Sequence, residues 1–305
     1  MDKSILIFYF CVLAMCPTFS QERTTPPLLE NLKVGFVSYR TGSAEVYLMN
    51  SDGSDVEQIT SSSEDNSFPF QIDAVTIGFT RMDSSRNTTK HKINIHTKEE
   101  SLLEEKTFVK GAKWEEPSPD KSFVAFIRST DYSDRELFLY DRNTKEEIKL
   151  TSNIDEKHKA LSINYKWSPD GRTLAIMSGP DWYSQYISLY RLGTDELVRL
   201  TERGYMNSGL LWLKDNKTLI ANLKIRDETL YELYSIDVFS GNLKQLTTDK
   251  NLHPNISPDG KWIVFESQRH ANDGEVYIMK PDGSSQYRLT SNPDYNGRCF
   301  WFSLH

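Results

Sequence analysis

Short segments in which apolar and polar residues alternate recur along the chain, and this pattern predicts β-strands. Six of the segments are alike, because each carries β-branched or aromatic residues on a short pleat. They are residues 46–49, 93–96, 137–140, 187–190, 233–236 and 276–279. A threonine closes each repeat, at Thr60, Thr107, Thr151, Thr201, Thr247 and Thr290. These threonines are 43 to 50 residues apart, a period typical of a repeated four-stranded unit.

A turn motif precedes the same position in several repeats. Ser-Pro-Asp-Gly occupies residues 168–171 and 257–260, and a decayed copy, Ser-Pro-Asp-Lys, occupies residues 118–121. Proline presets φ at the first corner, aspartate bonds the backbone two residues on, and glycine takes the positive φ that ends the turn. The repeats that begin near residues 71 and 212 lack this motif but keep the alternation, so we count them as well.

The repeats together predict an all-β fold, a six-bladed β-propeller of four-stranded blades. The two ends of the chain are out of phase with the blades. Residues 34–38 match the second strand of a blade, whereas residues 299–303 match the first strand. We therefore expect the C-terminal strand to complete the N-terminal blade and to close the ring, which removes open sheet edges.

The combination of Ser-Pro-Asp-Gly before an apolar strand, and of Asp-Gly and Leu-Thr after a tyrosine-containing strand, resembles the TolB-type propeller repeat. The resemblance covers residues 32–305 and is closest over residues 257–290. The resemblance implies the propeller fold and, less directly, that the protein is an exported binding or scaffold protein of the cell envelope. TolB-type propellers hold peptide segments of their partners at the channel mouth, so the resemblance implies an envelope protein or peptide as partner. TolB itself carries an α/β domain before its propeller, and this chain resembles the propeller half.

The N-terminal segment predicts export. Residues 4–15 are apolar and follow Lys3, and small residues precede Gln21, which is typical of a secretory signal peptide. We therefore predict a signal peptide at 1–20, a mobile tether at 21–31 and the propeller at 32–305, in the periplasm or secreted. A lipid anchor at Cys16 is the alternative. No segment is long and apolar enough to predict a transmembrane span.

Charge and cysteine content exclude several classes of function. The formal net charge is −7, so the protein lacks the excess of basic residues that is typical of a nucleic-acid-binding protein. A chain cut before Gln21 keeps only Cys299, so no internal disulfide is expected, and we interpret Cys299 as a small buried apolar residue. The acidic charge and the closed sheet edges predict a monomer.

The usual catalytic signatures are absent from the sequence. There is no Gly-x-Ser-x-Gly, no His-Glu-x-x-His and no cysteine pair at zinc spacing, so we predict no cofactor and no metal. His253 and His270, with Gln268, leave one alternative open. A histidine cluster of this kind on a propeller would suit a metal-assisted lyase or hydrolase that acts on a saccharide.

The candidate ligand-binding residues lie on the loops and inner strands that the repeat places at one face of the ring. Aromatic and mixed-charge side chains suit contacts with a peptide or a saccharide. The candidates are Glu115, Tyr165, Lys166, Trp182, Tyr205, His253, Asn255, His270 and Arg298. Their positions are counted back from the turn, and an error of one residue would reverse the direction of a side chain.

Overall fold

The computed structural model describes residues 25–104, 107–129, 135–150, 162–179, 185–194, 196–202, 205–225, 230–270 and 273–305, without the side chains at 162–163 and 205–208. The predicted signal peptide, residues 1–20, and Cys16 lie outside these ranges. Within the described part of the chain no helix has the length and hydropathy that a membrane span requires.

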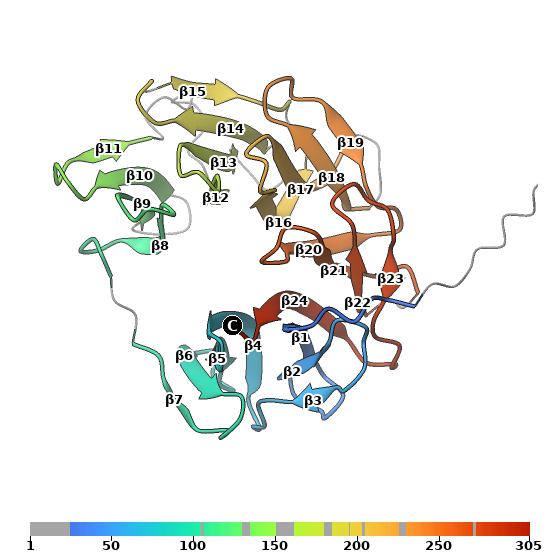
Figure 1. Ribbon diagram of the computed structural model, residues 1–305. Coiled ribbons are helices and arrows are strands. Elements are labelled where there is room, and N and C mark those ends of the chain that lie inside the picture. The colour runs from blue at the N-terminus through green and yellow to red at the C-terminus, as the bar shows by residue number, and fades with distance from the viewer. Residues whose placement is uncertain are drawn as a thin grey trace, which may run out of the picture.

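The described strands form six four-stranded antiparallel sheets, which are arranged as the blades of a ring (Figure 1). Blade 1 consists of β24 (Asn296–Ser303), β1 (Leu32–Ser38), β2 (Glu45–Asn50) and β3 (Glu57–Gln58). Blade 2 consists of β4 (Asp65–Asp73), β5 (Thr76–Met82), β6 (Thr88–Asn94) and β7 (Glu100–Leu102). Blade 3 consists of β8 (Lys113–Pro117), β9 (Phe123–Ser129), β10 (Arg135–Asp141) and β11 (Glu147–Lys149).

The remaining three blades follow in chain order. Blade 4 consists of β12 (Ser162–Trp167), β13 (Thr173–Gly179), β14 (Tyr186–Arg191) and β15 (Glu196–Arg199). Blade 5 consists of β16 (Tyr205–Trp212), β17 (Thr218–Lys224), β18 (Glu232–Asp237) and β19 (Leu243–Gln245). Blade 6 consists of β20 (Asn251–Ile256), β21 (Ile263–Ser267), β22 (Glu275–Met279) and β23 (Tyr287–Arg288). The predicted six-bladed propeller is confirmed.

The C-terminal strand completes the first blade, as the sequence predicts. β24 pairs with β1 in antiparallel fashion, with Val34 opposite Trp301 and Gly35 opposite Phe300. The first and last strands of the chain therefore lie side by side (Figure 1). Residues 25–31, predicted as part of a tether, lead into β1. There the Ser51 hydroxyl donates to the carbonyl of Pro27 at 2.9 Å, and it accepts from the amide of Leu29 at 2.6 Å.

One strand assignment from the sequence is wrong. The third strand of blade 2 was expected at residues 93–96, but β6 covers Thr88–Asn94 and a turn follows it. His91 pairs with Phe79 and stacks on its ring, just as Tyr47 pairs with Phe36 and stacks on its ring in blade 1. His91 therefore holds the place of Tyr47. The third strand of blade 2 consequently lies nearer the N-terminus than residues 93–96, where the sequence predicts it.

The core lies between the blades. Apolar clusters of buried residues join blades 3 and 4, 4 and 5, 5 and 6, 6 and 1, and 1 and 2. In the cluster between blades 1 and 2, for example, Val46 and Leu48 of β2 pack against Ile77 and Phe79 of β5. Blades 1, 4, 5 and 6 thus bury both faces in these clusters, which stabilises the ring through non-directional apolar packing.

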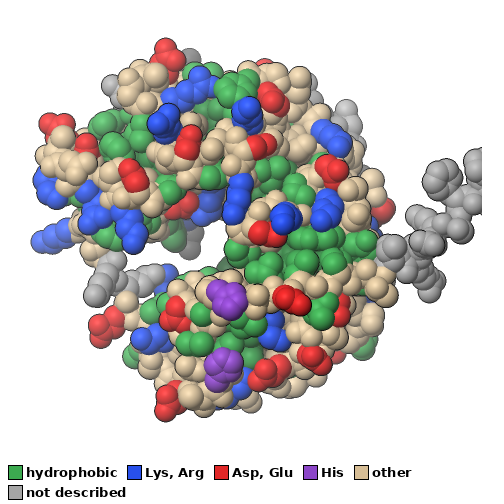
Figure 2. All heavy atoms as spheres, in the orientation of Figure 1, with side chains coloured by type: hydrophobic (Ala, Val, Ile, Leu, Met, Phe, Trp, Pro, Cys, Tyr) green, Lys and Arg blue, Asp and Glu red, His purple; other side chains and the backbone are tan. Residues whose placement is uncertain are grey.

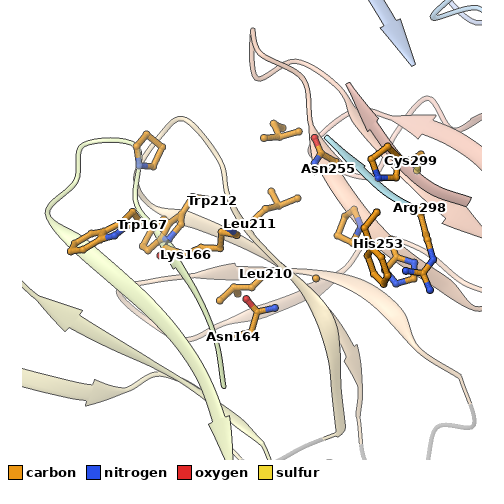
Figure 3. Close-up of a pocket in the computed structure, with 16 residues that line it drawn as sticks. Asn164, Lys166, Trp167, Leu210, Leu211, Trp212, His253, Asn255, Arg298 and Cys299 are labelled. Carbon is orange, nitrogen blue, oxygen red and sulfur yellow. Dashed lines mark hydrogen bonds between the residues drawn. The ribbon is translucent and has the colours of Figure 1, made fainter. Parts of the chain in front are cut away.

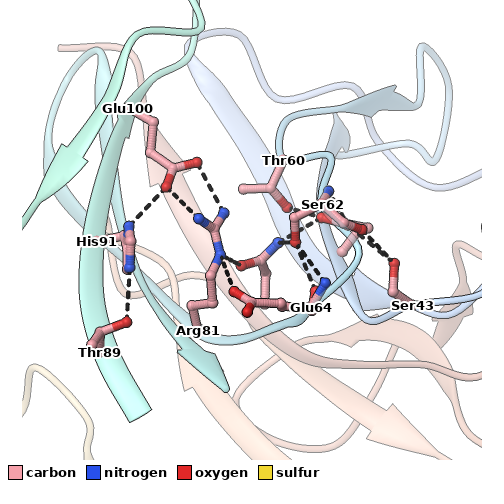
Figure 4. A network of polar contacts seen from close by, with 10 residues as sticks. Ser43, Thr60, Ser62, Glu64, Arg81, Thr89, His91 and Glu100 are labelled. Atoms are coloured by element: carbon pink, nitrogen blue, oxygen red, sulfur yellow. Dashed lines mark hydrogen bonds and ion pairs between the residues drawn. The ribbon is translucent and has the colours of Figure 1, made fainter. Parts of the chain in front are cut away.

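Buried polar networks tie several blades together at the end where the closing threonines lie. The hydroxyl of Thr247 donates to the buried carboxylate of Glu232 at 2.8 Å and accepts from the amide of Leu233 at 2.9 Å. Asn251 of the next blade donates to the same carboxylate at 2.7 Å. Figure 4 shows the corresponding network between blades 1 and 2, where Thr60 and Arg81 take part. The closing threonine therefore positions a buried carboxylate of its own blade, and that carboxylate also contacts the next blade.

Candidate ligand pocket at the centre of the ring

The innermost strands of four blades contain a bulge with one residue in the left-handed region. These residues are Phe68 on β4 (φ 51°), Trp114 on β8 (φ 52°), His253 on β20 (φ 51°) and Arg298 on β24 (φ 48°). A shift in strand register accompanies each of them. Positive φ is uncommon for residues with a side chain, and bulges of this kind reorient side chains beside functional sites.

A pocket of ≈ 580 Å³, here called the channel pocket, lies between the innermost strands of five blades, β4, β12, β16, β20 and β24. Figure 3 shows Asn164, Lys166 and the Leu210–Trp212 stretch on one side, with His253, Asn255 and Arg298 facing them. The lining residues are Phe68, Pro69, Asn164, Lys166, Trp167, Pro169, Gly209, Leu210, Leu211, Trp212, His253, Pro254, Asn255, Ile256, Arg298 and Cys299.

The channel pocket combines apolar walls with basic side chains. Its lining contains Lys166, His253 and Arg298 and, among the described residues, no aspartate or glutamate. The Arg298 guanidinium lies over the ring of Phe68, 3.9 Å from the ring centroid, which is a cation–π contact. Lys166 pairs at 2.6 Å with Glu116, a residue outside the lining. The pocket is therefore suited to a ligand with apolar parts and carboxylates.

A buried carboxylate behind the pocket holds His253 and the Arg298 backbone in place. Glu266 on β21 accepts from Tyr295 at 2.9 Å and from the amide of Arg298 at 3.3 Å, and it bonds the Nδ1 atom of His253 at 3.1 Å. Burial alone would raise the pKa of Glu266, but the bond and charge of His253 and the other donors outweigh it and lower the pKa. With Nδ1 engaged, His253 keeps its Nε2 atom for other partners.

The same carboxylate affects two neighbouring groups. Burial, followed by the negative charge of Glu266, raises the pKa of the Tyr295 hydroxyl and of the Cys299 thiol. Cys299 is buried, so its thiol is protonated and resembles an apolar side chain.

Four of the predicted site residues line one pocket: Lys166, His253, Asn255 and Arg298. Tyr165 instead is buried in the cluster between blades 3 and 4, where its hydroxyl donates to the carbonyl of Trp114 and burial raises its pKa.

The other predicted site residues lie elsewhere or outside the described part of the chain. The Glu115 carboxylate accepts from the amides of Phe108 and Val109, both at 2.7 Å, and lines a different pocket. His270 packs near Tyr277, with ring centroids 6.2 Å apart, and does not line the channel pocket. Trp182 lies outside the described residues, and the side chain of Tyr205 on β16 is not described.

Sequence reasoning missed Phe68, Asn164 and Trp212 in the lining and Glu266 behind it. Asn164 could have been found, because it lies two residues before Lys166 on a regular strand and so shares its face. Phe68 and the pairing of Glu266 with His253 could not, because Phe68 and His253 lie in bulges that alternation does not reveal.

The described residues contain no group of three or more histidine, cysteine, aspartate or glutamate side chains that could hold a metal ion. His253 and His270, the two histidines of the metal-assisted alternative, do not share a pocket. No observation in the described part of the chain therefore favours that alternative.

Six four-stranded blades around a central pocket define the class of the protein, a β-propeller. Residues 152–303 match the family model described as the TolB beta propeller domain. The fold is similar to that of TolB from Acinetobacter baumannii, at 21% identity, with a TM-score of 0.64 and coverage of 88% of this chain and 66% of that one. This match confirms the resemblance to the TolB-type β-propeller repeat family that the turn motifs predict.

Two curated proteins also resemble the chain. The "Uncharacterized peptidase YuxL" of Bacillus subtilis is 27% identical over 210 residues, which cover 53% of this chain and 31% of that protein. The "Uncharacterized protein Atu1656" of Agrobacterium fabrum is 33% identical over 129 residues, which cover 41% of this chain and 42% of that protein. The matched part is thus less than half the length of either relative.

Proposed function

We propose that this protein is a binding or scaffold module that holds an extended segment of a partner protein in the channel pocket. The observation that carries the proposal is the lining itself, which combines Lys166, His253 and Arg298 with apolar walls and contains no carboxylate among the described residues. An acidic peptide with interspersed apolar side chains fits that combination, because basic groups attract its carboxylates while apolar surface is buried.

The shape of the site supports a chain-like ligand. The pocket lies on five different strands that come from blades 2, 4, 5, 6 and 1, so a ligand that crosses it would contact several blades. The left-handed residues His253 and Arg298 are held by one buried carboxylate, Glu266, which fixes the site before a ligand arrives. Such preorganisation lowers the entropic cost of binding.

The place of action that we propose is the cell envelope, in the periplasm or outside the cell. The support for this is the apolar segment at residues 4–15 together with the match of residues 152–303 to the TolB beta propeller domain. Mass spectrometry of the N-terminus of the exported protein tests it. A chain that begins at Gln21 is expected, whereas a lipidated Cys16 would replace free export by anchoring.

The binding proposal can be tested with a fluorescein-labelled nonapeptide of alternating glutamate and leucine, followed by fluorescence anisotropy. We expect saturable binding that weakens with added salt, and at least tenfold weaker binding of the glutamine–leucine counterpart. The double variant Lys166→Gln/Arg298→Gln should lose most of the affinity. Lys261→Gln is the matched control, because Lys261 is an exposed lysine in a turn, away from the pocket lining. Equal binding of the two peptides, or no effect of the double variant, would refute the proposal.

A further inference from the structure

The junction between blades 2 and 3 differs from the other five. Apolar clusters occupy five junctions of the ring, but no such cluster of described residues joins blade 2 to blade 3. The surface is hollowed between these two blades (Figure 2), in the region between β4–β7 and β8 in Figure 1. Among the described residues, no apolar cluster closes the ring at this junction.

Two lysines in blade 2 explain the missing cluster. The stacked pairs Phe36–Tyr47 and Phe79–His91 align the third strands of blades 1 and 2, so that Lys90 and Lys92 hold the places of Val46 and Leu48. In blade 1 these two aliphatic residues are buried against the next blade. Lys90 and Lys92 are exposed, because burying a lysine ammonium is costly.

The facing side of blade 3 also departs from the repeat. Trp167 and Trp212 donate their indole N–H to carbonyls on the inner strand of the preceding blade, at 3.0 and 2.9 Å. Pro117 holds the corresponding place at the end of β8, opposite Val124, as Trp167 lies opposite Leu174. Proline offers no indole, so this bond between neighbouring inner strands has no donor at the junction of blades 2 and 3.

A pocket of ≈ 620 Å³, here called the blade 2–3 pocket, occupies this junction. Its lining residues are Phe70, Lys90, Leu103, Glu104, Thr107, Phe108, Ala112, Lys113, Trp114 and Glu115. Three of its aromatic side chains are exposed to an unusual degree, Phe70 by 40%, Phe108 by 46% and Trp114 by 57%. Large exposed rings gathered in one hollow are typical of a binding site.

The charges of the lining favour an anion. Lys90 of blade 2 and Lys113 of blade 3 both line the pocket. The Glu115 carboxylate accepts hydrogen bonds from the amides of Phe108 and Val109, so these backbone donors partly compensate its negative charge. Among the described lining residues, Glu104 is the only other carboxylate, and it is exposed. Flat apolar walls with lysines from both blades suit a flat apolar body that carries one acidic group.

We propose that the blade 2–3 pocket binds a small aromatic anion, whose rings lie among Phe70, Phe108 and Trp114 and whose acidic group lies toward Lys90 and Lys113. This site goes beyond the proposed function, since it lies in a different pocket and does not depend on a peptide in the channel. The ligand would fill the space that an apolar cluster fills at the other junctions, and so would join blades 2 and 3.

The experiment is a fluorescence titration of the native protein with 8-anilinonaphthalene-1-sulfonate and, separately, with N-phenyl-1-naphthylamine, which has the same rings without the sulfonate. We expect one site for the sulfonate, and at least fivefold weaker binding of the neutral compound. The double variant Phe108→Ala/Trp114→Ala should weaken sulfonate binding more than tenfold, because it removes two of the walls. The double variant Lys90→Gln/Lys113→Gln should reduce the preference for the sulfonate to less than twofold.

Matched controls separate this site from others. Phe239→Ala removes another exposed aromatic ring, 71% exposed, in blade 5, and Lys166→Gln removes a lysine of the channel pocket; both should leave sulfonate binding unchanged. Unchanged melting temperature of each variant without the dye verifies the fold. Equal affinity for the two compounds overturns the proposal, and so does binding that Lys166→Gln abolishes while Phe108→Ala/Trp114→Ala leaves it intact.

Discussion

The ring of Phe300 lies so close to Gly35 that a Cβ at residue 35 would stand 2.0 Å from the Cε1 atom of Phe300. The two residues face each other across β1 and β24, the strands that close the ring. Phe300 belongs to the apolar cluster between blades 1 and 2 and cannot move without opening that core. We expect Gly35→Ala to lower the free energy of unfolding by about 1–3 kcal/mol, as overpacking does, and urea denaturation measures it.

Blade 2 offers the matched control for this prediction. A Cβ at Gly78 would stand 2.3 Å from the Cζ atom of Phe70, but Phe70 is 40% exposed and can turn toward solvent, whereas Phe300 is 5% exposed. Gly78→Ala should therefore cost less than Gly35→Ala. The reverse order would show that the closing strand is not the tighter of the two contacts.

Most of the fold could be predicted from the sequence, because each repeat carries its own turn chemistry. The Ser257 hydroxyl donates to Asp259 at 2.6 Å, the Lys261 amide donates to the same carboxylate at 3.0 Å, and Gly260 has φ 76°. These are local interactions, and they depend only on residues close in sequence. Such contacts recur wherever the motif does, so the motif alone places a turn and the two strands around it.

The predicted position of β6 was wrong because the residues of this strand do not show the alternation of apolar and polar side chains. With lysines at 90 and 92, the only apolar alternation lies at Ile93 and Ile95, and the true partner of Phe79 is His91. That pairing is set by contacts across the sheet, which a single segment does not contain.

The site could be predicted only in part for a similar reason. Counting back from the turn puts Lys166 and Tyr165 together at the site, but on the regular strand β12 Lys166 lines the channel pocket whereas Tyr165 points the other way into a blade core. On β20 and β24 the count passes a bulge. His253 and Arg298 are the left-handed residues of these two bulges, and their left-handed backbone directs them to the pocket in a way that alternation cannot reveal.

The closing threonine of blade 5 should be important for stability. Thr247 is buried and its hydroxyl bridges the amide of Leu233 and the carboxylate of Glu232. Thr247→Val keeps the shape but leaves both groups without this partner, so we expect a loss of about 1–3 kcal/mol in the free energy of unfolding. Thr248→Val is the control, because Thr248 is exposed and should change stability little. Equal effects of the two variants in urea denaturation would contradict this role.

Glu266 should make stability depend on pH. Its pKa in the folded protein is lowered below the ordinary value of 4.5, so the folded state binds the proton more weakly than the unfolded state. The stabilisation is therefore present above that value and is lost as pH falls through the lowered pKa. We expect Glu266→Gln to melt at a lower temperature than the unaltered protein at pH 7, and the difference to shrink below about pH 4.5. A difference that stays constant or grows in acid would argue against an ionised Glu266.

The backbone at Arg298 should be strained, and the strain can be separated from the loss of the guanidinium. Arg298 has φ 48°, where a Cβ costs roughly 1–2 kcal/mol, so Arg298→Gly should be more stable than Arg298→Ala. Lys166 lies on a regular strand and also lines the channel pocket, so the order should reverse there, with Lys166→Gly less stable than Lys166→Ala by roughly 0.5–1 kcal/mol. Both Arg298 variants lose the charge and should bind the acidic nonapeptide equally weakly. Higher stability of Arg298→Gly than of Arg298→Ala, at equally weak binding, is expected when backbone strain is retained to aim a side chain at a ligand.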